Sequence, residues 1–250
     1  MFRAQHELKE QLQNELGFKE RDKTPEEEQI SDLVNEATNQ VLGKYGVPPL
    51  DISSDHVHLL PGEAYEDLFP NSVEGGASYN PSYQAIFFSD FGPDERLEFA
   101  QTLFHEMIHF KFWNALQVID SRNRPQTYRT GIATVSRDGR QLFLNSLNEA
   151  ITEELTQEFF EASLKNHPLF SRELEKKMRP RGYAAERNRY NELLEKIREK
   201  SRGRYSVSEL KEAFVRAAAT GNLLPIARLI EETLGRGAFS QIVGDGDLTA

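Results

Sequence analysis

Apolar residues recur at helical spacing over much of this 250-residue chain. Near the N-terminus a stripe of leucines predicts a first helix that stops at Gly17, formed by Leu8, Leu12 and Leu16. A second helix is expected to begin at Pro25, with Thr24 as its cap, and to end at Gly43.

Between residues 46 and 90 the pattern changes to prolines, glycines and short alternating runs, and residues 55–60 and 83–88 are predicted strands. A long helix is then expected from Gly92 to about Leu116. Its apolar residues cover most of its circumference, so we expect this helix to be buried.

A hairpin is predicted next, because residues 131–135 and 141–144 flank an Asp-Gly turn. A further helix is expected from about Asn148 to Leu164. Everything beyond Asn166 has a helical pattern, with a capping box and two glycine stops: Ser206 with Glu209, Gly221 and Gly235.

Together these elements predict an α+β fold. A small mixed sheet is expected to pack against the buried helix of residues 92–116 and the helix that follows the hairpin. We expect an N-terminal helical segment over residues 1–45, a core over 46–165 and a helical C-terminal subdomain over 166–250, all in one compact unit.

The composition of the chain argues against several classes of function. The net charge of −10 argues against a broad nucleic-acid footprint, because a phosphate backbone would be repelled. The absence of cysteine removes thiolate zinc sites and cysteine nucleophiles. No apolar run approaches the length that spans a bilayer, and no signal peptide is recognisable, so we expect no membrane partner and a cytoplasmic location.

The most informative motif is His105-Glu-Met-Ile-His109, inside the long predicted helix. Residues four apart lie on one helical face, so both imidazoles can reach a single metal ion. Glu106 projects to the side, where a carboxylate can accept a proton from water. Two solvent-exposed histidines beside a glutamate would be the simpler interpretation, but it fits an apolar helix poorly, since buried imidazoles need a partner.

A third ligand is still required. No cysteine exists, and the histidine that the metzincin class would require is replaced by Ala115. The remaining common solution is a glutamate on a second helix, and Glu149 and Glu153 share one face of such a helix. One of them can bind the metal while the other supports a ligand histidine.

Two segments resemble the gluzincin clan, the thermolysin-like metallopeptidases: His105-Glu-Met-Ile-His109 and Asn148-Glu-Ala-Ile-Thr-Glu153. The resemblance implies a zincin-like core, one Zn²⁺ ion held by His105, His109 and Glu149, and Glu153 as the partner of His105. It covers about a quarter of the chain. The gap between His109 and Glu149 is wider than in thermolysin, and a glutamate stands where aspartate is usual at position 153.

The expected activity is therefore zinc-dependent hydrolysis of peptide bonds in a peptide or protein substrate, with Glu106 as the general base that acts on metal-activated water. The family also supplies a tyrosine or histidine for the oxyanion. Tyr183 is our candidate for this role, and the residues that compete with it are Tyr128, Tyr190 and His167.

Two other features bear on the substrate. Phe87 and Phe88 belong to the strand before the metal helix, and in the resembled family such a strand forms the upper edge of the sheet, which pairs with extended substrate. No acid follows Gly75-Gly76, near the place where aminopeptidase relatives bind the substrate amine, which favours endopeptidase action.

Some alternatives stay open. His56 and His58 are expected on one face of a half-exposed strand, with a second metal site as the other possibility. The N-terminal helices are expected to be a scaffold rather than a built-in inhibitor. For the whole chain, the alternatives are a non-catalytic regulatory or binding module with a structural metal, and an SprT-like protease, which would need a third histidine soon after the helix.

Overall fold

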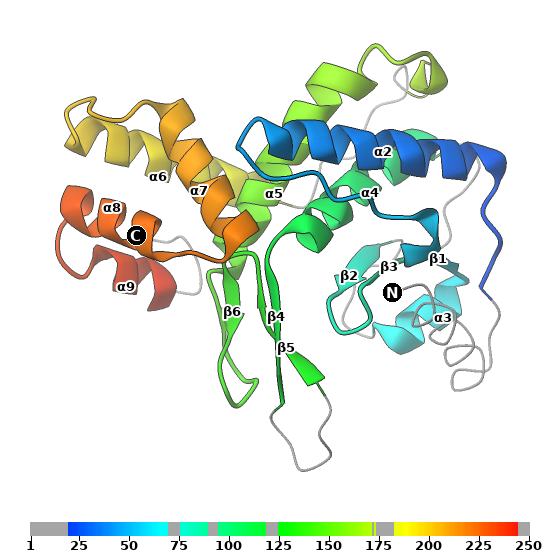
Figure 1. Ribbon diagram of the computed structural model, residues 1–250, viewed down its shortest axis with the longest axis horizontal. Coiled ribbons are helices and arrows are strands. Elements are labelled where there is room, and N and C mark those ends of the chain that lie inside the picture. The colour runs from blue at the N-terminus through cyan, green and yellow to red at the C-terminus, as the bar shows by residue number, and fades with distance from the viewer. Residues whose placement is uncertain are drawn as a thin grey trace.

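The computed structural model describes residues 20–69, 76–89, 95–118, 125–171, 173 and 183–244. It is a mixed structure of helices and two small sheets, as expected for the α+β class (Figure 1). The predicted helix around Leu8 to Leu16, Gly75 and the predicted start of the metal helix at Gly92 lie outside the described residues. Within them, no helix has the length and apolar character to cross a membrane.

Helix α2 (Pro25–Gly43) has the predicted bounds. The Thr24 hydroxyl accepts a hydrogen bond from the Glu27 N–H, and the Glu27 carboxylate accepts one from the Thr24 N–H, which completes a capping box. Its apolar face, which includes the fully buried Ile30 and Val34, packs along α4 (Arg96–Lys111).

The first sheet has the strand order β1 (Val57–Leu60), β3 (Ala85–Ser89) and β2 (Ala77–Asn80). β1 is parallel to β3 and β2 is antiparallel to it, so the predicted mixed sheet is confirmed. Because β3 is the central strand, the expectation that the Phe87–Phe88 strand forms the edge is wrong. Among the described residues, β2 is an edge strand whose outer side pairs with no other strand.

The strand that carries His58 is buried rather than half-exposed, because α3 (Gly62–Leu68) covers the face of the sheet opposite α4. His58 stacks on Phe87, and its Nδ1 lies 3.2 Å from Glu20. His56 precedes the strand in a 3-10 turn, where Nδ1 donates to the Gln84 carbonyl. The two histidines therefore do not share a strand face as expected.

Helix α4 (Arg96–Lys111) is buried on nearly every side, as its sequence indicates. Its first turn is capped from elsewhere in the chain, since the Glu173 carboxylate accepts hydrogen bonds from the Leu97 N–H (2.6 Å) and from Arg96 Nε (3.0 Å). The helix ends five residues before the predicted Leu116. There the Asn114 amide donates to the carbonyls of the last turn, which stops the helix and turns the chain into a strand.

A second, antiparallel sheet follows, with the order β4 (Asn114–Val118), β5 (Pro125–Thr130), β6 (Ala133–Val135) and β7 (Leu142–Phe143). The predicted hairpin is confirmed as β6–β7. The β4–β5 pair was not predicted. In Figure 1 this sheet lies between the three-stranded sheet and the C-terminal helices.

Helix α5 (Asn145–Phe159) begins three residues earlier than expected and continues as a π-helical turn, η2 (Phe160–Leu164). It packs against α4 and α6 (Ala184–Lys200). The remaining elements in the described part of the chain are η3 (Pro168–Phe170), α7 (Val207–Thr220), α8 (Leu224–Leu234) and α9 (Ala238–Gly244).

The sequence signals for the C-terminal helices are confirmed. Ser206 and Glu209 form the predicted capping box, and Gly221 and Gly235 follow the last residues of α7 and α8. One buried cluster contains Ile30 of α2, Leu103 of α4 and Leu210 of α7, so the C-terminal helices share their core with α4.

Candidate metal centre

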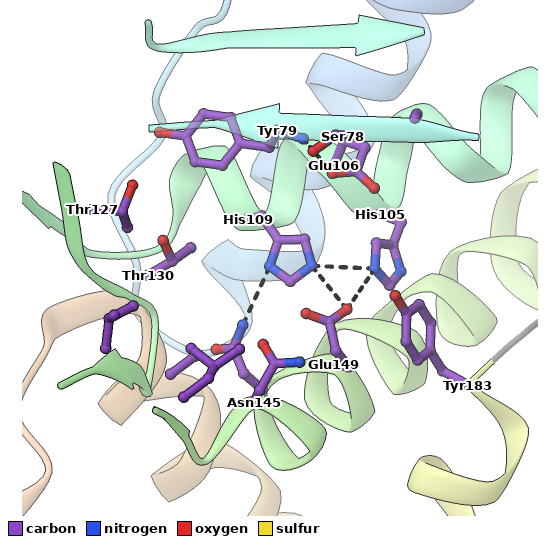
Figure 2. Close-up of a pocket in the computed structure, with 15 residues that line it drawn as sticks. Ser78, Tyr79, His105, Glu106, His109, Thr127, Thr130, Asn145, Glu149 and Tyr183 are labelled. Carbon is purple, nitrogen blue, oxygen red and sulfur yellow. Dashed lines mark hydrogen bonds and ion pairs between the residues drawn. The ribbon is translucent and has the colours of Figure 1, made fainter. Parts of the chain in front are cut away.

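The structure brings three side chains from two helices to one point (Figure 2). His105 and His109 lie one turn apart on α4, and Glu149 reaches them from α5. Nε2 of His105 lies 3.2 Å from Nε2 of His109. Oε2 of Glu149 lies 3.1 Å from the first nitrogen and 3.3 Å from the second. The three atoms form a nearly equilateral triangle.

This triangle fits a tetrahedral metal ion. With zinc–ligand bonds of about 2.0–2.1 Å, the ligand atoms of a tetrahedron are about 3.3 Å apart. Two imidazole nitrogens 3.2 Å apart would otherwise direct lone pairs at each other, unless a proton lies between them. Among the residues that the structure describes, this is the one group of at least three possible ligands with such spacing.

Without a metal, the charges of the centre compensate one another. Burial alone would lower the pKa of His105, but the hydrogen bond with Glu149 and the nearby carboxylates of Glu153 and Glu106 outweigh it and raise the pKa to about 9. Burial would likewise raise the pKa of Glu149, whereas the charge of His109 and the hydrogen bond from His105 hold it well below its usual range. In the metal-free site, His105 therefore holds a proton, and a bound cation can replace this proton.

Two side chains of α5 support the histidines from behind. Oε2 of Glu153 lies 3.6 Å from Nδ1 of His105, an ion-pair distance that is long for a hydrogen bond. The amide nitrogen of Asn148 lies 3.3 Å from Nδ1 of His109. Both side chains are almost completely buried. The Glu153 carboxylate can accept the N–H of a metal-bound imidazole, whereas the Asn148 amide nitrogen is a donor and contacts His109 without accepting from it.

Glu106 lies outside the triangle, as predicted from its place on the helix. Its Oε2 accepts a hydrogen bond from the backbone N–H of Tyr79 on β2 (2.8 Å), and its carboxylate lines the pocket beside the histidines. Because this N–H points away from β3, the free edge of β2 faces the pocket. Nothing in the sequence pattern indicated this contact, which depends on how β2 crosses α4.

Tyr183 lies in the same pocket, at the start of α6. Its ring stacks on His105, with 5.4 Å between ring centres and 9° between ring planes. Burial, together with the charges of Glu149 and Glu106, raises the pKa of its hydroxyl well above the ordinary value. The phenol therefore stays protonated and can donate a hydrogen bond.

The competing candidates for this role lie elsewhere. Tyr128 is exposed on β5 and is not among the residues that line the pocket. Tyr190 is buried between α6 and α7 against Phe214. Nδ1 of His167 accepts a hydrogen bond from the Leu169 N–H and so caps η3.

The walls of the pocket come from three directions (Figure 2). β2 contributes one wall, the second sheet another, and the start of α5 the floor; the lining residues other than those above are Ala77, Ser78, Thr127, Thr130, Ala133, Val135, Leu142 and Asn145. Sequence reasoning missed most of these residues, because the β4–β5 pair that places the second sheet was not predicted.

Comparisons of the chain with protein-family models, curated proteins and solved structures give no match. The geometry and chemistry of the pocket therefore carry the functional argument.

Proposed function

We propose that this protein is a zinc-dependent metallopeptidase with a zincin-like core. The observation that carries the proposal is the triangle of His105, His109 and Glu149, with the carboxylate of Glu106 beside it and not part of it. Two neutral imidazoles and one carboxylate are a ligand set typical of catalytic zinc, since they leave a position open.

The roles of the side chains follow from their places. When bound, zinc supplies a Lewis acid that polarises a carbonyl oxygen and acidifies water. Glu106 accepts a proton from the attacking water and returns it to the leaving amine. Tyr183 donates a hydrogen bond to the oxyanion of the tetrahedral intermediate. Asn148 and Glu153 keep the imidazoles in place.

The pocket suits an internal segment of an extended peptide. The outer side of β2 faces the pocket, where the Tyr79 N–H donates to Glu106, and a substrate strand that pairs along this edge would lie beside Glu106. Among the described lining residues, the ionisable side chains are those of the metal triangle, Glu106, Tyr79 and Tyr183. Burial raises the pKa of the Tyr79 hydroxyl, so it stays neutral, and no charged side chain outside the metal centre and Glu106 is available to pair with a charged terminus of a peptide, which favours an endopeptidase.

A structural metal is the rival interpretation. It would require four protein ligands and no route for a substrate. The described residues offer three ligands, and these line an open pocket rather than a closed core. An SprT-like arrangement would require a third histidine near the end of α4, where the chain instead continues into β4.

Replacing Glu106 with Gln tests the proposal. The zinc-loaded variant should retain one zinc ion per chain and lose peptide cleavage by about a thousandfold, within the range that general-base catalysis contributes. Glu98→Gln, on the same helix two turns earlier, is the matched control and should cleave like the wild type. Full activity in Glu106→Gln would remove Glu106 from its role and the proposal with it.

A further inference from the structure

The second sheet turns one of its faces towards the metal pocket. Directly opposite residues of antiparallel strands point to the same side of a sheet. Leu142 pairs with Val135, and Ala133 pairs with Thr130. All four line the pocket, so this face of the β5–β6–β7 sheet forms one wall of it.

The wall is apolar where it is most accessible. Leu142 is 48% exposed, although it lies inside the pocket that contains the metal triangle. Val135 beside it is half-buried, and Ala133 continues the apolar surface inward. An apolar side chain that covers this surface would be stabilised by the water it displaces.

The rest of the pocket does not favour a charged occupant at this wall. The described lining residues include no lysine, arginine or aspartate, and the carboxylates of Glu106 and Glu149 belong to the metal centre. A charged side chain placed against Leu142 would lose its hydration without gaining an opposite charge.

We propose that Ala133, Val135 and Leu142 form a specificity subsite for an aliphatic or aromatic side chain of the substrate, next to the bond that is cleaved. This inference rests on the proposed peptidase function and adds a substrate class to it. The wall belongs to the hairpin between the two ligand helices, so the same segment that connects His109 to Glu149 also selects the substrate.

Two arginine substitutions test the subsite. Leu142→Arg places a cation on the wall, whereas Leu116→Arg places one on β4 of the same sheet, at a leucine that is 45% exposed and does not line the pocket. The substrates are peptides that differ at one position, with Leu or Asp next to the cleaved bond. Cleavage is measured with the zinc-loaded full-length chain.

The wild type and Leu116→Arg should prefer the leucine peptide by about tenfold or more, as hydrophobic pockets do. Leu142→Arg should abolish or reverse this preference. Equal preference in Leu142→Arg and Leu116→Arg, or no preference in the wild type, would overturn the subsite.

Binding separates the subsite from the catalytic proposal. Affinities of the same peptides for the zinc-loaded Glu106→Gln protein, alone and combined with Leu142→Arg, are measured by calorimetry. A leucine preference that Leu142→Arg removes would support the subsite even if the wild type cleaved no peptide, and that absence of cleavage would count against the peptidase. Equal affinities with normal cleavage would contradict the subsite alone.

Discussion

The amide nitrogen of Asn148 lies 3.3 Å from Nδ1 of His109, inside the contact between α4 and α5. The other end of the same side chain accepts a hydrogen bond from the backbone N–H of Ile132 (3.1 Å), where the turn between β5 and β6 meets α5. One buried carboxamide therefore links the metal helix, the second sheet and the helix of Glu149.

Asn148→Ala should weaken both the fold and the metal site. The buried Ile132 N–H loses its acceptor, which should lower the free energy of unfolding by about 1–3 kcal/mol. Zinc affinity, measured against a competing chelator, should also fall, because the helix that carries Glu149 loses its hydrogen bond to the second sheet. Gln157→Ala removes an exposed amide from the same helix and should bind zinc like the wild type. Equal affinities of the two variants would contradict the role of Asn148.

A substitution at Gly131, in the turn between β5 and β6, tests the same contact of Asn148 with the second sheet. Its φ of +59° is in the left-handed region, and a Cβ there would overlap the side-chain oxygen of Asn148 and approach Phe112 at 3.0 Å. Gly203 has a similar φ of +75° but open space around it. Gly203→Ala should therefore cost about 1 kcal/mol of stability from backbone strain alone. Gly131→Ala should cost at least about 2 kcal/mol more and also weaken zinc binding, as chemical unfolding and chelator competition would show. Equal losses of stability in the two variants would show that the Asn148 side chain moves aside at no cost, which would contradict the proposed link.

Tyr183→Phe removes the proposed donor to the oxyanion and keeps the ring that stacks on His105. Removal of one such donor typically lowers kcat by about 100-fold to 1,000-fold. We expect this loss with an unchanged zinc content, and no loss in Tyr128→Phe, whose hydroxyl is exposed on β5. Steady-state kinetics of the two variants test this role. A wild-type kcat in Tyr183→Phe would show that the Tyr183 hydroxyl does not stabilise the oxyanion.

Metal binding should depend on pH, because a cation must displace the proton of His105. With the pKa of His105 at about 9 in the metal-free protein, zinc affinity should rise about tenfold for each pH unit between pH 7 and pH 9. Calorimetry in buffers of different ionisation enthalpy should detect at least one proton released at pH 7. A pH-independent affinity over this range would contradict the raised pKa.

The same shift fixes the sign of the stability change in the metal-free protein. The folded-state pKa of His105 lies above its ordinary value of 6.5. Its protonation therefore stabilises the fold fully below pH 6.5, and this contribution is lost as the pH rises towards 9.

Local signals in the sequence predicted much of this structure. The cap at Thr24, the capping box at Ser206 and the glycine stops at Gly221 and Gly235 fix helix ends through neighbouring residues, so they can be recognised without a fold. The spacing of His105 and His109 similarly places both on one helical face. That Glu149 rather than Glu153 reaches the triangle required the resemblance to a known family, because spacing alone left both possible.

The predictions that were wrong depend on contacts between different elements of the fold. The end of α4 depends on the Trp113 N–H donating to the Ala218 carbonyl of α7, a partner far along the chain. The burial of His58 follows from α3 covering the sheet. Such contacts form only when distant elements meet, so the pattern along the chain cannot show them.

X-ray absorption at the zinc edge tests the central claim most directly. For the zinc-loaded protein, the account predicts two imidazole nitrogens and two oxygen ligands, one from Glu149 and one from solvent, at about 2.0–2.1 Å. Glu149→Gln should change this environment, whereas Glu161→Gln, an exposed position further along the chain, should not. A spectrum with four protein ligands, or one that is identical in wild type and Glu149→Gln, would contradict a zinc site formed by two histidines, Glu149 and one solvent molecule.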